Sequence, residues 1–199
     1  MVELNNAGTK IGGLGMIPFQ LSFGRILAVV GGAFAVTYLL FQKKLLPLPV
    51  AKVVSKILFL PTFPITAMMR IGNYWTEVDD TLILGCAPFS IFNHPDSLKK
   101  LGVKGVVNMC YEYNGPTKDY ARLGIKQLHL PTVDHTEPAV ETLIDAVAFI
   151  QQHKERGERV YVHCKAGHGR AASVALSWLL HQHRDKSPKV IFLITSANS

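Results

Sequence analysis

Apolar residues form two long runs near the N-terminus and short, regularly spaced groups after them. The first run, residues 26–41, has sixteen residues and no charged side chain. A bilayer-spanning helix needs about 20 such residues, and Leu21 and Phe23 extend the run toward that length. We therefore expect a transmembrane anchor over residues 25–42, preceded by a tail over residues 1–24. A buried core helix is the alternative; a cleaved signal peptide fits less well, because two lysines follow the run directly.

The second apolar run, residues 50–70, is interrupted by two lysines and two prolines. Proline lacks an amide donor and clashes with the preceding helical turn, so we expect no single continuous helix here. Residues 50–60 fit a basic amphipathic helix lying on a membrane, and equally a helix packed against the following domain. We assign residues 43–70 as a basic, amphipathic juxtamembrane segment.

From about Ile71 the pattern becomes that of a soluble α/β domain. Short groups of β-branched residues predict strands at 81–85, 103–109, 126–130 and 159–163. Helical spacing predicts helices at 95–101, 138–153 and 169–183, the second with Val140, Leu143, Ile144, Val147 and Ile150 on one face. This alternation predicts an α/β fold with a central, mostly parallel sheet flanked by helices.

Composition and charge narrow the class of protein. With 48% hydrophobic and 18% charged residues the chain is not disordered, and three cysteines exclude a disulfide scaffold. The net charge is +7, and seven basic residues but one acidic residue precede Ile71. Because the basic part is also the apolar part, the charge indicates a membrane surface and not nucleic acid. More lysines follow the first apolar run than precede it, which predicts that the C-terminal bulk lies on the cytosolic or matrix side.

The segment that indicates chemistry is Val160-Tyr-Val-His-Cys-Lys-Ala-Gly-His-Gly-Arg170. A predicted strand ends at Cys164, a loop with two glycines follows, and Arg170 begins a helix. Backbone N–H groups at such a helix start form an anion site and stabilise the thiolate form of a cysteine at the base of the loop. Arg170 can hold two phosphate oxygens in bidentate fashion. A thiolate facing a bound phosphate is a nucleophile for phosphoryl transfer.

A Cys-x5-Arg spacing alone is weak evidence, and the alternative is a buried cysteine at a strand end. The strand, the His-Cys pair, the glycine at the third position and the apolar helix together favour the catalytic interpretation.

These residues resemble the signature H-C-x-x-G-x-x-R-[ST] of cysteine-dependent protein tyrosine phosphatases. The chain looks most similar to the dual-specificity-type mitochondrial phosphatases that dephosphorylate phosphatidylglycerophosphate. Further stretches carry the resemblance, which covers residues 72–188: Leu84-Gly-Cys-Ala-Pro88, 101–109, Glu112-Tyr113, Leu130-Pro-Thr-Val-Asp134 and 161–167. We take residues 71–188 as the phosphatase domain.

The resemblance implies a role for each matching residue. Cys164 is the nucleophile, Arg170 binds phosphate, and Asp134, 30 residues before the cysteine, is the general acid. Helix capping is the alternative role for Asp134, and Glu137 is the second candidate acid. His163 would fix the loop by hydrogen bonds. The remaining candidates for substrate binding are Lys165, Ala166, Gly167, His168 and Gly169 of the loop, with Glu112 and Tyr113 at the pocket rim.

No metal or other cofactor is expected, because the histidines lack zinc-site spacing. Cys86 and Cys110 are interpreted as core thiols; the alternative is that one resolves an oxidised Cys164.

Two features depart from the resemblance. Ala171 stands where the signature has Ser or Thr, a donor that helps the thiolate leave, so we expect slow turnover with phosphoenzyme accumulation. Residues 189–199 look like a divergent short tail, so the C-terminal helices appear truncated.

The sequence thus predicts a single-pass, membrane-anchored phosphatase acting on a phosphorylated lipid, phosphatidylglycerophosphate. Its alternatives are a protein tyrosine or dual-specificity phosphatase acting on phosphoproteins, and an inactive or truncated phosphate-binding isoform. The resemblance favours the mitochondrion, with the endoplasmic reticulum as the rival. The oligomeric state is left open.

Overall fold

The structure is a computed structural model that describes residues 23–68 and 70–183. Most of the expected N-terminal tail and all of the expected C-terminal tail lie outside these residues. The chain divides into two compact units, residues 1–39 and residues 40–199.

The first unit contains most of helix α1, Phe23–Gln42. Its segment Gly24–Gln42 has a mean hydropathy of 1.8 over 19 residues, and its side chains are mostly exposed. By length and composition this helix could cross a membrane, as the sequence predicted. Signal sequences and core helices can have the same length and hydropathy.

Helix α2, Leu48–Met68, runs continuously through both prolines, so the expectation of a broken helix was wrong. Each proline removes one amide donor, but neighbouring hydroxyls bond to main-chain carbonyls of the same stretch. Thr62 Oγ1 donates to the Leu58 carbonyl at 2.6 Å, and Thr66 Oγ1 donates to the Thr62 carbonyl at 3.3 Å. Phe59 and Phe63 are buried against the α/β domain, which stabilises the helix around the prolines.

The α/β domain that follows α2 is built on a five-stranded sheet with the order β1-β2-β5-β3-β4. The strands are β1 Trp75–Glu77, β2 Leu82–Gly85, β3 Val103–Cys110, β4 Lys126–Thr132 and β5 Arg159–His163. Only β1 pairs antiparallel to its neighbour. The mostly parallel sheet confirms the predicted fold class.

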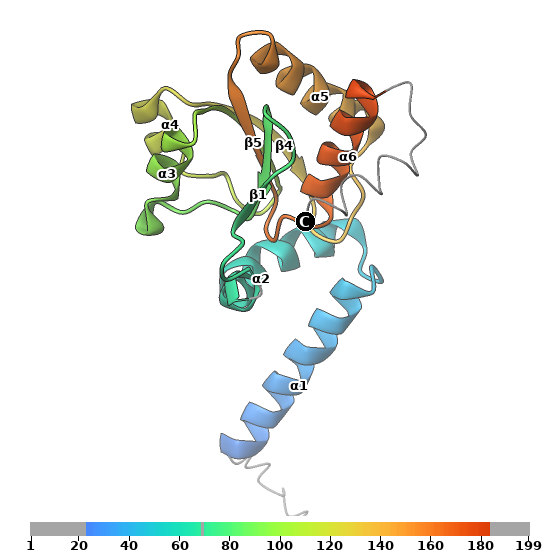
Figure 1. Ribbon diagram of the computed structural model, residues 1–199. Coiled ribbons are helices and arrows are strands. Elements are labelled where there is room, and N and C mark those ends of the chain that lie inside the picture. Colours follow the sequence, from blue (N-terminus) through green and yellow to red (C-terminus); the bar gives the residue numbers. More distant parts are fainter. Residues whose placement is uncertain (1–22, 69, 184–199) are drawn as a thin grey trace, which may run out of the picture. The chain divides into compact units, whose positions relative to one another are not determined.

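Helices cover both faces of this sheet (Figure 1). On one face lie α5, Val140–Lys154, and α6, Arg170–Gln182, over a core that includes Val107, Val162 and Trp178. On the other lie α3, His94–Lys100, and α4, Thr117–Leu123, over Leu98, Tyr120 and Tyr161. Because both faces are covered, the central strands are apolar throughout, as is typical of parallel sheets.

Three short elements were not predicted: β1, α4 and the 3-10 turn η1, Ser90–Phe92. Each has three to seven residues, too few for a clear periodic pattern.

The apolar face predicted for α5 is only partly covered. Ile150 is buried, but Val140 and Ile144 are 66% and 61% exposed. They line an open apolar groove together with residues of α6, including Leu180.

Candidate active site

The phosphate loop, residues 164–170, begins at the end of the central strand β5. Cys164 is buried, and Arg170 starts α6, as the spacing predicted. Both neighbours of β5, strands β2 and β3, run parallel to it. The loop therefore lies at the carboxyl ends of parallel strands, where α/β folds bind ligands.

The loop is held against the segment that follows β2. The Ala87 amide donates to the Lys165 carbonyl at 3.2 Å, and Cys86 Sγ lies 3.4 Å from the Ala166 carbonyl. Gly167 has φ +75°, and a Cβ there would lie 2.8 Å from the Gly85 carbonyl oxygen. Glycine is therefore required at this position by both conformation and space.

Arg170 is the centre of a buried charge network. Its Nη2 and Nη1 donate to the two Glu112 carboxylate oxygens at 2.8 and 3.0 Å. Nη1 also donates to the Thr132 carbonyl at 2.7 Å, and Nη2 donates to Asp134 Oδ1 at 2.9 Å. Although burial opposes its charge, the two carboxylates hold the pKa of Arg170 above its usual value. The bidentate partner in this structure is Glu112, whereas the sequence suggested phosphate.

Glu112 lies deeper than the pocket rim implied by the resemblance. Its side chain is 1% exposed, and both of its oxygens accept from Arg170. Such a fork-to-fork pair fixes the plane of the guanidinium, so Glu112 orients Arg170.

Asp134 lies on the turn that follows β4, and its carboxylate reaches Arg170 from 36 residues away. The turn is closed by the Thr136 amide, which donates to the Val133 carbonyl at 3.1 Å. His135 has φ +62°, in the left-handed region that histidine, asparagine and aspartate adopt more often than other non-glycine residues. Glu137, the second candidate acid, is exposed and pairs with Lys44, so the structure brings Asp134 and not Glu137 to Arg170.

His163 is fully enclosed beneath the loop. Its Nδ1 lies 3.3 Å from the Cys164 carbonyl oxygen and can only donate to it. Burial lowers the pKa of His163 to about 3, so the imidazole is neutral at physiological pH. A neutral donor can fix the loop without adding charge beside the nucleophile.

Helix α2 contributes contacts that the sequence did not reveal. The Lys165 ammonium donates to Thr62 Oγ1 and lies 5.7 Å from the Phe59 ring centre. Burial lowers the pKa of Lys165. The Tyr113 ring stacks on Phe59 at 5.2 Å, and its hydroxyl donates to the Pro88 carbonyl at 2.6 Å. These residues lie far apart along the chain. A single sequence does not show that they pack together.

Arg70, after α2, is a further cation near the loop. Burial raises the pKa of the Cys86 thiol, and the nearby Arg70 charge opposes that rise. The Arg70 charge also adds to burial in lowering the pKa of the exposed His168. The other loop glycine, Gly169, is exposed.

The other two cysteines are buried thiols, and all three cysteines are free. Burial raises the pKa of Cys110 well above its usual value. Buried neutral thiols of this kind are poor nucleophiles, in contrast to a cysteine at an anion-binding loop.

Ala171 is fully buried, directly after the arginine. Ser173 does not replace the missing hydroxyl, because its Oγ donates to the Gly169 carbonyl at 3.1 Å within its own helix.

A cysteine at the base of an anion-binding loop, an arginine oriented by a glutamate and an aspartate held nearby define a class of protein. It is a phosphatase domain of the cysteine-dependent type.

Comparison with known proteins agrees with this class. The family model of the dual specificity phosphatase catalytic domain matches residues 82–198. Phosphatidylglycerophosphate phosphatase PTPMT2 of Arabidopsis thaliana is 34% identical over 148 residues, which cover 69% of this chain and 62% of that protein. Human phosphatidylglycerophosphatase and protein-tyrosine phosphatase 1 is 30% identical over 157 residues, covering 73% of this chain and 78% of that one.

Among solved structures, PTPMT1 in complex with PI(5)P has a TM-score of 0.54 and 30% identity, covering 60% of this chain and 79% of that one. The chain therefore belongs to the dual-specificity phosphatase family. It spans less than two thirds of the length of its plant relatives, 62% of PTPMT2 and 36% of PTPMT1.

Proposed function

We propose that this protein is a membrane-anchored phosphatase that hydrolyses a phosphate monoester through a cysteinyl-phosphate intermediate. One observation carries the proposal: three segments far apart in the sequence converge on Arg170, which starts the helix after the Cys164 loop and binds both Asp134 and Glu112.

In the first step the Cys164 thiolate attacks phosphorus, and the bond from phosphorus to the leaving oxygen breaks. Asp134 gives its proton to that oxygen, so an alcohol leaves. The loop amides and Arg170 bind the phosphoryl oxygens. Because Arg170 Nη2 donates to Asp134 in the structure, the incoming phosphate takes over this donor and frees the carboxyl group for the leaving oxygen.

In the second step the Asp134 carboxylate takes a proton from water, and the water oxygen attacks phosphorus. The phosphorus–sulfur bond breaks, the thiolate returns, and inorganic phosphate leaves. Ala171 offers no hydroxyl to the departing thiolate, so this second step limits the rate.

Phosphatidylglycerophosphate is the proposed substrate. The support is the activity for which the plant and mammalian relatives are named, at 30–34% identity, and the complex of PTPMT1 with a phosphoinositide. Both ligands are phospholipids that carry a phosphate monoester. The mitochondrion is the proposed organelle, on the resemblance alone.

Membrane attachment is supported by two features. Helix α1 is long and apolar enough to span a bilayer, and only five residues separate it from α2. One side of α2 packs on the domain through Phe59 and Phe63, while apolar side chains of its other side are exposed. These exposed side chains include Val53, Ile57, Leu60 and Ile65. We propose that this apolar face rests on the lipid surface. The Lys52 and Lys56 ammonium groups instead lie over the Tyr111 ring of the domain, 5.5 and 4.8 Å from its centre.

The test offers the full-length protein phosphatidylglycerophosphate in vesicles and a phosphotyrosine peptide, with Cys164→Ser as blank. Preferential release of phosphate from the lipid is expected. Preference for the peptide would instead support a protein tyrosine phosphatase. Release from neither substrate by folded protein would support the phosphate-binding isoform.

Co-flotation with the vesicles tests the membrane part separately. The full-length protein is expected to float with them, and a protein that stays in the soluble fraction would contradict membrane attachment whatever its substrate.

A further inference from the structure

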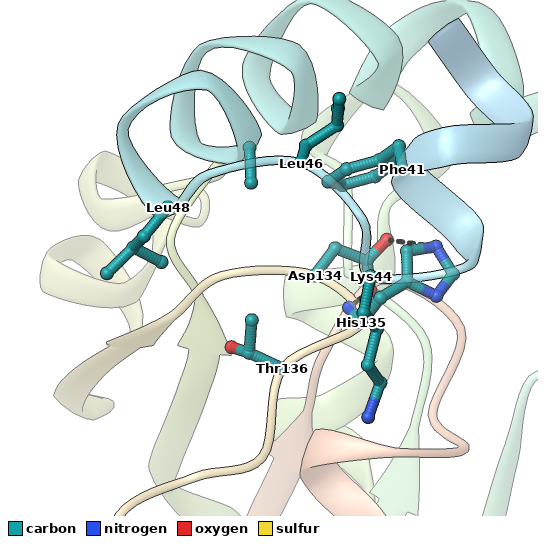
Figure 2. A pocket seen from close by; sticks show the side chains of 8 residues that line it. Phe41, Lys44, Leu46, Leu48, Asp134, His135 and Thr136 are labelled. Carbon is teal, nitrogen blue, oxygen red and sulfur yellow. Dashed lines mark hydrogen bonds and ion pairs between the residues drawn. The ribbon is translucent and has the colours of Figure 1, made fainter. Parts of the chain in front are cut away.

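The turn that carries Asp134 lies against residues 40–47, which comprise the end of α1 and the five residues that join it to α2; we call this segment the connector. Figure 2 shows side chains of both segments around one small pocket. Its volume is about 170 Å3, and its lining includes Phe41 and Lys44 of the connector and Asp134 and His135 of the turn. Both segments belong to the same compact unit of the chain.

Two contacts join the connector to the turn on either side of Thr136. The Phe41 ring meets the His135 ring edge-on, with 5.0 Å between ring centres. The Lys44 ammonium forms an ion pair with Glu137 Oε1. One contact is therefore one residue after the proposed acid, and the other is three residues after it.

The two contacts contribute unequally to the attraction between the connector and the turn. Phe41 is only 4% exposed although it lies in an otherwise exposed apolar helix, so its burial provides most of the attraction. The ion pair is exposed at both ends, and such pairs contribute little to stability. The ion pair can still fix the orientation of the turn, because Lys44 attracts the Glu137 end of the turn toward the connector.

The connector itself is shaped for this contact. Lys44 has φ +58°, and its amide donates to the Phe41 carbonyl at 3.1 Å, which ends the helix. The Leu45 amide donates to the Leu40 carbonyl at 3.0 Å. This is the usual left-handed termination of a helix, made here by a lysine, and it brings Lys44 beside the turn.

Few bonds within the turn itself fix its conformation. It follows β4, the strand at the end of the sheet order. Within the turn, Thr136 donates to the Val133 carbonyl, and the His135 amide donates to Asp134 Oδ1 at 3.1 Å. His135 Nε2 also lies 3.8 Å from Asp134 Oδ2 (Figure 2). A residue with positive φ next to the acid persists only where its surroundings hold it.

We propose that Phe41 and Lys44 are positioning residues, which hold the Asp134 turn so that its carboxyl group meets the leaving oxygen. The proposal rests on the proposed function, because it requires Asp134 to be the general acid. It makes proton transfer depend on the segment that joins the membrane helix to the domain.

The test exploits the leaving group. An alkyl phosphate, such as a phosphoserine peptide, needs a well-placed acid, whereas an aryl phosphate such as p-nitrophenyl phosphate leaves readily without one. The ratio of kcat on the alkyl substrate to kcat on the aryl substrate thus reports acid placement, and a general loss of folded enzyme does not change it.

For full-length protein in detergent, Phe41→Ala is expected to lower this ratio about tenfold, a part of the 10² to 10⁴ that a general acid contributes. Lys44→Glu should lower it about threefold, the size of an exposed ion pair, and Lys44→Glu with Glu137→Lys should restore it. The exposed neighbours provide matched controls: Leu45→Ala and Lys43→Glu should leave the ratio unchanged.

Equal losses on both substrates, or equal effects of the controls, would overturn the proposal. If Phe41→Ala fails to fold, the exposed Lys44→Glu variant and its charge reversal decide the question. Asp134→Asn separates the two hypotheses. If it does not lower the ratio, the acid role itself fails; if it does while the connector variants do not, only the positioning role fails.

Discussion

The phosphate loop and the turn that carries the proposed general acid are held in different ways. The phosphate loop, residues 164–170, follows the central strand of the sheet, with Cys164 and Arg170 buried. The general-acid turn, residues 133–137, follows the terminal strand β4, and Phe41, Lys44 and Arg170 contact it. Cys164, the proposed nucleophile, is thus buried in the core, whereas Asp134, the proposed acid, lies in a turn that Phe41 and Lys44 contact.

The largest expected effect is at the residue that joins the two regions. Arg170→Lys should lower kcat/KM about 10² to 10³-fold on alkyl and aryl phosphates alike, as expected for loss of a principal charge-stabilising donor. Lysine cannot reproduce the fork that binds both Glu112 oxygens while contacting Asp134. Steady-state kinetics on both substrates measure it, with the exposed Arg122→Lys as control. A loss confined to alkyl substrates would show that Arg170 serves the acid turn alone.

An intermediate effect is expected at Ala171, directly after the phosphate loop, where the family signature has Ser or Thr. Ala171→Ser should raise the steady-state rate about tenfold, because a hydroxyl there can donate to the departing thiolate. Rapid-quench experiments should show a burst of alcohol release in the natural protein and a smaller burst in the variant. Equal burst and steady-state rates in the natural protein would mean that phosphoenzyme hydrolysis is not limiting.

The smallest effect is expected on stability. Gly167→Ala should destabilise the domain by about 1–3 kcal/mol, since alanine must adopt φ +75° with its Cβ near the Gly85 carbonyl. Gly169→Ala is the matched control, because Gly169 has φ −73° and a Cβ there meets nothing within 4 Å. Thermal unfolding of both variants measures the difference. Equal melting temperatures would show that the phosphate loop is less rigid than its contacts indicate.

Sequence reasoning succeeded where local pattern dominates. The strand of β5 was predicted with its observed bounds, and the Cys164-to-Arg170 loop follows from neighbouring residues alone. Asp134 was identified only through resemblance, because its distance from Cys164 along the chain does not show that the two segments meet. The continuous α2 was missed because packing of Phe59 and Phe63 outweighs the local cost of two prolines.

The sequence by itself determined the α/β fold, the apolar N-terminal helix and the nucleophile loop, because each depends on periodicity or on contiguous residues. The tertiary structure alone decided that Glu112 binds Arg170, that Lys165 contacts α2 and that Phe41 packs against His135 beside Asp134. The physical reason is that these contacts join residues 58, 103 and 94 positions apart. No local propensity encodes such pairs; they arise only when the sheet and its helices bring distant segments together.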